Sequence, residues 1–153
     1  MRIVCAVFTL AVAALAADQA AFTVWRDSDL KAKEKELAGK STRQRMASET
    51  LATYGNHLTM LAHRKASGEP EVHERMADFF VVETGEATLL VGGKVIGGKN
   101  VAPGEIRGGR IEGGEKQTLA VGDVVHIVAG IPHQLLLDPG KEFTYFVIKV
   151  EKP

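Results

Sequence analysis

The chain has 153 residues, of which 45% are apolar and 25% are charged, and lysine plus arginine equals aspartate plus glutamate at 19 each. A chain of this length and composition is typical of one globular domain with a buried core. Because no excess of positive charge is present, nucleic acid and anionic membrane surfaces are excluded as expected partners.

The N-terminal segment matches a secretory signal peptide. Arg2 precedes an apolar run over residues 3–17, and Ala14 and Ala16 form an A-x-A cleavage pattern. The run is shorter than the ~20 residues that span a bilayer. We therefore expect residues 1–16 to be cleaved off, leaving no transmembrane segment. The alternatives are a buried N-terminal helix and an uncleaved anchor.

Cleavage at this point would remove Cys5, the single cysteine of the chain. The mature protein would then have no thiol, which excludes disulfides, thiolate metal ligands and a cysteine nucleophile. This composition is compatible with the extracytoplasmic location, periplasmic or secreted, that a signal peptide predicts.

The next segment, residues 17–44, is predicted to be a helical extension. Within it, residues 27–40 (DSDLKAKEKELAGK) have apolar residues near helical spacing. Asp27 or Ser28 can cap the start of this helix, and Gly39 can end it.

From residue 45 onward the hydrophobic pattern is mainly that of strands. A short strand is expected at 46–51. Six further segments are rich in β-branched, aromatic and leucine residues and are bounded by glycine or proline: 57–64, 79–84, 87–91, 124–128, 133–137 and 143–150. Short strands at close intervals predict a mainly β fold, an antiparallel sandwich or barrel over residues 45–153.

A glycine-rich span, residues 92–116, separates two groups of these strands. Its Gly-x-Gly pieces neither lead from a strand into a helix nor precede Lys-Ser/Thr, so they do not indicate a phosphate site. We expect an extended loop with one short strand at 110–112. A loop of this length is either the rim of a site or a plain surface excursion.

Two stretches combine histidines, carboxylates and glycines at regular spacing. In the first, 70-PEVHERMADFFVVETG-85, four residues separate His73 from Asp78 and six separate Asp78 from Gly85, while Glu71 lies two residues before His73. In a strand, residues 71 and 73 point to the same face. A reversal of the chain would then return Asp78 opposite them.

The second stretch, 122-GDVVHIVAGIPHQLLL-137, is a strand, a tight turn and a second strand that begins at His133. Gly122 and Gly130 precede this histidine by eleven and three residues. Together the two stretches resemble the paired motifs of the cupin superfamily. The resemblance covers residues 45–150 and implies an antiparallel jelly-roll β-barrel, with a short N-terminal helix after the signal peptide.

The sequence departs from the cupin motifs at several positions. Glu71 stands in place of the first histidine of the first motif, and Asp78 in place of its glutamate. In the second motif, Val128 replaces a proline and Leu137 replaces an asparagine. The opening glycine of the first motif has no counterpart at the expected distance.

Glu71, His73, Asp78 and His133 are the metal ligands that this resemblance implies. Two imidazoles and two carboxylates suit a divalent ion such as manganese, iron(II), zinc or nickel, and two histidines with one carboxylate suit non-haem iron oxygen chemistry. Other histidines, at 57, 63 and 126, are expected to be hydrogen-bonded core residues. Glu74 is expected to be solvated.

Three functions remain open at this point. The first is a metal-dependent, dioxygenase-type enzyme that acts on a small organic molecule. The second is a non-catalytic module that binds a small molecule or sugar. The third is a metal-free isomerase or epimerase with His73 or His133 as base, for which Tyr145 is an unplaced second proton-transfer group. A homodimer is also expected, with residues 41–51 adding to a partner's sheet edge.

The first prediction concerns processing. When the full chain is expressed in a bacterial host that exports it, intact-mass measurement should show a mature protein that begins at Ala17, because cleavage follows the A-x-A pattern. A matched variant, Ala14→Asp, should retain residues 1–16. Wild-type protein that keeps Met1 to Ala16 would contradict the extracytoplasmic location.

Overall fold

The computed structural model describes residues 22–41 and 45–153. The predicted signal peptide, residues 1–16, lies outside the described residues. Within the described part of the chain, no helix is both long and apolar enough to cross a membrane.

Most of the described chain forms antiparallel sheets. The five-stranded sheet has the order β1 (Met46–Thr53), β2 (His57–Arg64), β13 (Phe143–Glu151), β4 (Met76–Gly85) and β11 (Val124–Ile127). The six-stranded sheet has the order β10 (Glu115–Leu119), β5 (Ala87–Val91), β12 (His133–Leu136), β3 (Glu71–His73), β8 (Glu105–Arg107) and β7 (Lys99–Ala102). A small third sheet pairs β6 (Lys94–Ile96) with β9 (Arg110–Glu112).

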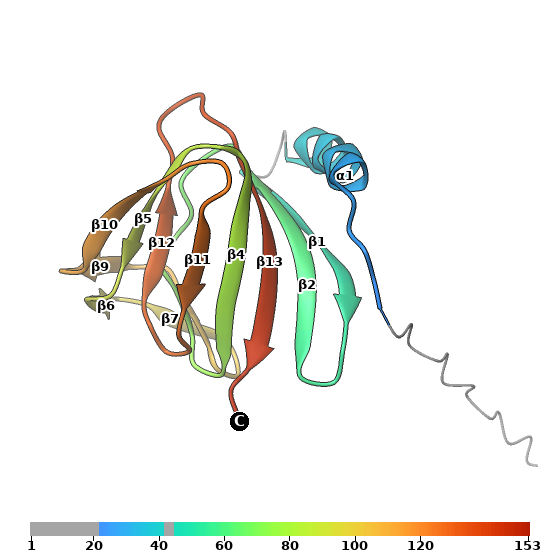
Figure 1. The fold of residues 1–153 in the computed structure, drawn as a ribbon. Coiled ribbons are helices and arrows are strands. Elements are labelled where there is room, and N and C mark those ends of the chain that lie inside the picture. Colours follow the sequence, from blue (N-terminus) through green and yellow to red (C-terminus); the bar gives the residue numbers. More distant parts are fainter. Residues whose placement is uncertain (1–21, 42–44) are drawn as a thin grey trace, which may run out of the picture.

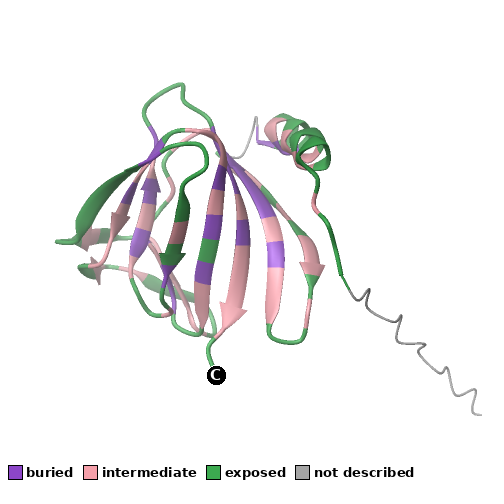
Figure 2. Ribbon diagram, in the orientation of Figure 1, coloured by how far each residue is buried: buried purple, intermediate pink, exposed green. Residues whose placement is uncertain are grey.

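The two larger sheets curve around a common interior (Figure 1). Buried and less buried residues alternate along their strands, as Figure 2 shows for β4 and β12. The buried members form one apolar core: Ala62, Phe80, Val82, Ala87, Leu89, Leu119, Ile127, Leu135, Leu137, Phe143, Tyr145 and Val147. The predicted mainly β, antiparallel jelly-roll architecture is therefore confirmed.

The interpretation of residues 92–116 as an extended loop was wrong. This span contains β6, β7, β8 and β9 and the start of β10, and only the strand at Arg110–Glu112 was anticipated. Gly-Gly pairs, and Pro103-Gly104 between β7 and β8, separate strands of three or four residues. Such strands are too short to show a period in the sequence. At Gly109 the backbone φ is +72°, and a side chain would clash with the carbonyl of Ile96, so the turn requires glycine.

The N-terminal helix α1 (Asp27–Lys40) is present as predicted and lies against β1 and β2. Its N-cap is Arg26, whose side chain makes no capping hydrogen bond, rather than Asp27 or Ser28, and its C-cap is Ser41 rather than the region of Gly39. Leu37 is the buried residue of the helix.

Glu34 ties α1 to the barrel. Its carboxylate accepts hydrogen bonds from the hydroxyls of Thr84 and Thr144. The helix therefore covers the outer side of the five-stranded sheet near β4 and β13. Strand β1 lies at the edge of this sheet, which is where the predicted homodimer would form; the dimer itself stays a prediction.

The second prediction concerns Gly85, the closing glycine of the first motif. Its φ is +81°, and a Cβ atom there would lie 2.0 Å from the carbonyl oxygen of Glu142. Gly85→Ala should lower the free energy of unfolding by more than about 2 kcal/mol, measured by denaturant titration. Gly55→Ala, where no atom lies within 4 Å, should change it by less than about 0.5 kcal/mol. Equal effects of the two changes would contradict this account of Gly85.

Candidate functional site

Strands β3 and β12 bring three of the predicted ligands together. Glu71 and His73 share one face of β3, and His133 of β12 is the register partner of Glu71. The backbone N–H of Gly130, in the turn before β12, donates to the carbonyl of His73 at 2.8 Å. As a result, one ligand atom each from Glu71, His73 and His133 lies within 4.8 Å of the others.

Hydrogen bonds orient both imidazole rings. Nδ1 of His133 lies 3.0 Å from the carbonyl oxygen of Ile131, and a carbonyl can only accept, so Nδ1 carries the proton. Nδ1 of His73 lies 2.7 Å from Oε2 of Glu105, a carboxylate that likewise accepts. Each neutral ring therefore presents Nε2 as a lone pair, and Nε2 of His73 is buried with no hydrogen-bond partner among the described residues.

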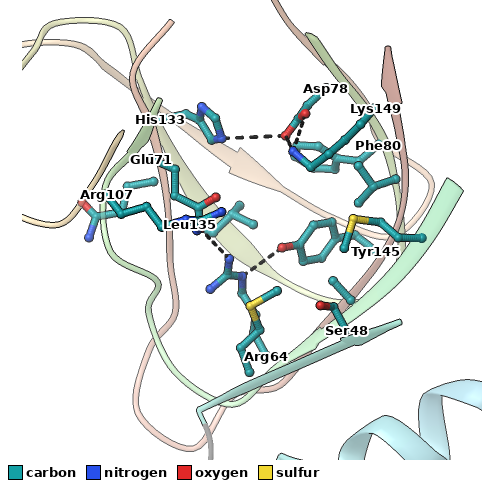
Figure 3. Close-up of a pocket in the computed structure, with 15 residues that line it drawn as sticks. Ser48, Arg64, Glu71, Asp78, Phe80, Arg107, His133, Leu135, Tyr145 and Lys149 are labelled. Carbon is teal, nitrogen blue, oxygen red and sulfur yellow. Dashed lines mark hydrogen bonds and ion pairs between the residues drawn. The ribbon is translucent and has the colours of Figure 1, made fainter. Parts of the chain in front are cut away.

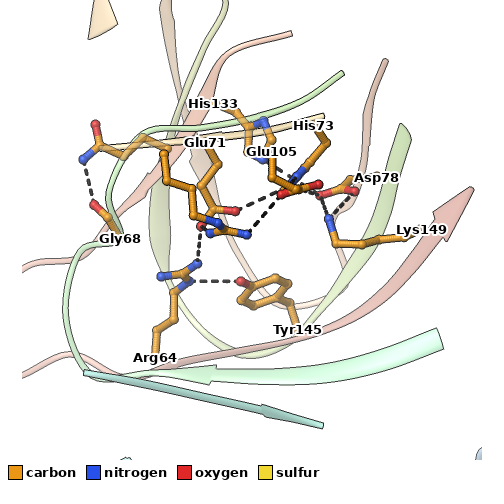
Figure 4. A network of polar contacts seen from close by, with 11 residues as sticks. Arg64, Gly68, Glu71, His73, Asp78, Glu105, His133, Tyr145 and Lys149 are labelled. Carbon is orange, nitrogen blue, oxygen red and sulfur yellow. Dashed lines mark hydrogen bonds and ion pairs between the residues drawn. The ribbon is translucent and has the colours of Figure 1, made fainter. Parts of the chain in front are cut away.

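Two guanidinium groups hold one oxygen of Glu71. Oε1 lies 2.8 Å from Nη1 of Arg107 and 3.3 Å from Nη2 of Arg64. The other oxygen, Oε2, lies 3.4 Å from Nε2 of His73. Figure 4 shows Glu71 between Arg64 and the two histidines. One carboxylate oxygen is thus left facing the imidazole nitrogens.

Asp78 lies on the opposite sheet, and its cationic partner differs from those of Glu71. Its two carboxylate oxygens accept from Nζ of Lys149 at 2.6 and 2.8 Å. Oδ2 is also 3.5 Å from Nε2 of His73 and 3.9 Å from Nε2 of His133. Asp78 therefore reaches the histidines as predicted, but a lysine ammonium already occupies its oxygens, so its role as a ligand stays a prediction.

Burial and the neighbouring charges give the two histidines different pKa values. Burial lowers the pKa of His133. Burial also acts to lower the pKa of His73, but the carboxylates of Glu71, Asp78 and Glu105 together outweigh it and the pKa is raised. Burial acts to raise the pKa of Glu71, yet His73 and the two arginines lower it to about 2. Glu71 is consequently ionised at neutral pH.

These features fit a divalent cation. Two imidazole nitrogens with free lone pairs and one ionised carboxylate oxygen converge on the same point. Each imidazole is oriented by a hydrogen bond at its other ring nitrogen, as is usual for metal-binding histidines. Lys149 is the feature that opposes a cation, because its ammonium lies beside Asp78.

Four charged residues of the site were missed by the sequence analysis: Arg64, Glu105, Arg107 and Lys149. Three of them are cross-strand partners, since the register pairs Arg107 with Glu71, Glu105 with His73, and Lys149 with Asp78. Opposite charges at paired positions of neighbouring strands interact directly. These pairs can be recognised in the sequence only when the strand register is known, and the glycine-rich span conceals the register of Glu105 and Arg107.

The remaining histidines differ from one another. His63 is buried and bonds Thr144 Oγ1 at 2.9 Å, as predicted for a core histidine. His57 bonds Asn56 and is only half-buried. His126 is exposed and stacks on Phe79 at 4.0 Å between ring centroids, so its interpretation as a core residue was wrong.

A cavity of about 140 Å³ adjoins the three-residue cluster. Figure 3 shows Asp78 and His133 at one end of it, Ser48 at the other, and Glu71, Arg64 and Tyr145 between them. Its remaining lining residues are Met46, Met60, Ala62, Phe80, Arg107, Gln134, Leu135, Val147 and Lys149. A small molecule in this cavity would lie next to the imidazole of His133.

Comparisons with known proteins bear on the fold. No family model matches the chain, and no curated protein matches its sequence. The structure is similar to that of the protein TT1209 from Thermus thermophilus, with a TM-score of 0.55 and 20% identity over 78% of this chain and 94% of that one.

Two further similar structures carry descriptive names. The cupin domain of Cnp3 from Schizosaccharomyces pombe matches with a TM-score of 0.53 and 7% identity, over 71% of this chain and 63% of that one. A recombinant oxalate oxidase in complex with glycolate matches with a TM-score of 0.52 and 14% identity, over 72% of this chain and 53% of that one. At these identities the likeness shows the fold alone.

The third prediction concerns the order in which the histidines titrate. In metal-free protein, ring-proton NMR should give His73 a midpoint above 6.5 and His133 a midpoint below 6.5, because the carboxylates around His73 raise its pKa against the effect of burial, whereas burial lowers the pKa of His133. Glu71→Gln should lower the midpoint of His73. Protonation of His133 before His73 would contradict the arrangement of charges.

Proposed function

We propose that this cupin-fold protein binds one divalent metal ion through Glu71, His73 and His133 and acts on a small organic molecule in the adjoining cavity. The observation that carries the proposal is the convergence of three free donor atoms, two Nε2 nitrogens and one carboxylate oxygen, within 4.8 Å of one another. A buried imidazole nitrogen without a partner is costly unless something binds it, and a metal ion would satisfy it.

The donor set indicates which chemistry the ion would supply. Two histidines and one carboxylate leave coordination positions open, which suits iron(II) and related ions in oxygen-dependent reactions; zinc, manganese and nickel accept the same donors. The chain's own residues would hold this set in place: Glu105 and the Ile131 carbonyl fix the rings, and Arg64 and Arg107 fix Glu71. A dioxygenase-type enzyme is the form of the proposal that we favour.

A second candidate is a metal-free protein, either an isomerase or epimerase or a binding module for a small molecule or sugar. The ion pair between Lys149 and Asp78 supports it, because an ammonium so close to the site disfavours a second cation. Metal content separates the candidates, since both metal-free forms require an empty cluster.

Location and assembly extend the proposal. An extracytoplasmic site of action, periplasmic or secreted, rests on the N-terminal signal pattern, and a homodimer rests on β1 as an exposed sheet edge.

The fourth prediction is metal content. Protein purified without a histidine tag and dialysed against a mixture of the divalent ions should carry close to one ion per chain by elemental analysis. His73→Ala and His133→Ala should each remove most of it, because each deletes a donor. Glu105→Gln should keep the ion but weaken its binding about 10–100-fold, since it only orients His73.

Two control variants accompany this test. Glu74→Ala alters an exposed carboxylate one residue from His73, and His126→Ala alters an exposed imidazole; both should leave the metal content unchanged. Circular dichroism of each variant checks that the barrel has folded. Negligible loading of the wild type, or loading that survives loss of both histidines, would overturn the metal proposal in favour of the second candidate.

A further inference from the structure

The cavity beside the histidine cluster has two chemically different parts. Its charged end is formed by Glu71, Asp78, His133 and their cationic partners. Its opposite end reaches β1, where Ser48 is exposed and Met46 is half-buried. A ligand would therefore enter along β1 and place its polar group at the histidines.

The walls between these ends are apolar. They are formed by Met46, Met60, Ala62, Phe80, Leu135 and Val147. A cavity of about 140 Å³ is close in size to the engineered cavity of about 150 Å³ that binds benzene. Because this volume includes the charged end, the whole ligand must be compact, with an apolar body no larger than about one six-membered ring.

The charges that line the cavity favour an anion. Three cationic side chains, those of Arg64, Arg107 and Lys149, face two carboxylates, those of Glu71 and Asp78. The lining thus carries one net positive charge with His133 neutral. Glu105, outside the lining, offsets that charge through Arg107 at 3.4 Å, so the excess positive charge would come from a divalent ion at the cluster. An acid that binds as its carboxylate anion would balance this charge.

Tyr145 provides a hydrogen-bond donor in this cavity. Nε of Arg64 donates to its hydroxyl oxygen at 3.0 Å, and a guanidinium can only donate. The hydroxyl proton of Tyr145 is therefore not used in this contact and remains available to a ligand. Figure 3 shows the hydroxyl directed toward the interior of the cavity, where Glu71 and Arg64 also lie.

We propose that the cavity binds a small monocarboxylate with a compact ring-sized apolar body, and that Tyr145 donates a hydrogen bond to the ligand carboxylate. The inference rests on the proposed function for a small molecule beside the metal cluster, and it adds the chemical class of that molecule. Tyr145 acts in it as the specificity-determining residue that distinguishes an anion from a neutral molecule of the same shape.

Benzoate and its neutral isostere nitrobenzene are the probes that test this inference. Isothermal titration calorimetry on the wild-type protein should show benzoate binding more tightly than nitrobenzene. Tyr145→Phe should weaken the binding of benzoate about 10–100-fold, as expected for a lost hydrogen bond to a charged group. It should weaken the binding of nitrobenzene by less than about threefold. A residue that merely supports the cavity wall would affect both probes alike.

Two further variants complete the design. Tyr54→Phe removes the hydroxyl of the chain's other tyrosine, which bonds Thr23 away from the cavity, and should change neither affinity. Ala62→Val narrows the apolar wall without altering a polar group, and should weaken benzoate several-fold while leaving acetate binding unchanged. Thermal unfolding and elemental analysis are recorded for every sample.

The outcomes separate this inference from the proposed function. The inference is overturned, and the metal proposal stands, if fully metal-loaded protein does not bind benzoate at 10 mM. The same holds if Tyr145→Phe weakens the binding of benzoate and of nitrobenzene equally. Tyr145-dependent benzoate binding to protein that holds no metal supports the inference and overturns the metal proposal. If Tyr145→Phe does not fold, an unaltered benzoate affinity in Ala62→Val overturns the inference.

Discussion

The carboxylate of Glu71 is the charge on which the polar end of the barrel depends. It is only 13% exposed, and a buried carboxylate that loses its partners costs several kcal/mol. Arg107 reaches it from β8, Arg64 from β2, and His73 from the same strand. The two sheets are therefore joined at this point by electrostatic contacts in addition to the apolar core. The same contacts fix the oxygen that faces the histidines.

Much of the fold could be predicted because its strands show clear periodicity and clear boundaries. The segment 57–64 was predicted with the bounds of β2, and 79–84 lies within β4. The motif glycines were equally informative, since Gly130 has a φ of +85° in the turn that carries His133 back toward β3. The match of His73 and His133 to the cupin motifs, with Glu71 at the place of the first histidine, was therefore sufficient to anticipate that these residues converge.

The surroundings of the site could not be predicted, because they depend on strand register. Lys149 pairs with Asp78 across 71 positions of sequence, and no local pattern marks such a contact. Glu105 and Arg107 lie in β8, a strand of three residues between glycine turns. A strand this short has too few residues to establish an alternation. The charges of Glu105 and Arg107 beside the cluster could therefore not be predicted without knowing that β3 pairs with β8.

The two arginines also explain how a glutamate can stand where the cupin motif has a histidine. An imidazole ligand is neutral, so a carboxylate at that position adds a negative charge to the cluster. Arg64 and Arg107 both bond Oε1 of Glu71 and draw that charge away from Oε2, the oxygen that faces His73. A cation bound there would meet a weaker donor than a free carboxylate and would retain more of its own positive charge. That remaining charge, together with Lys149, would favour an anion in the adjoining cavity, which links the departure at Glu71 to the class of ligand proposed for Tyr145.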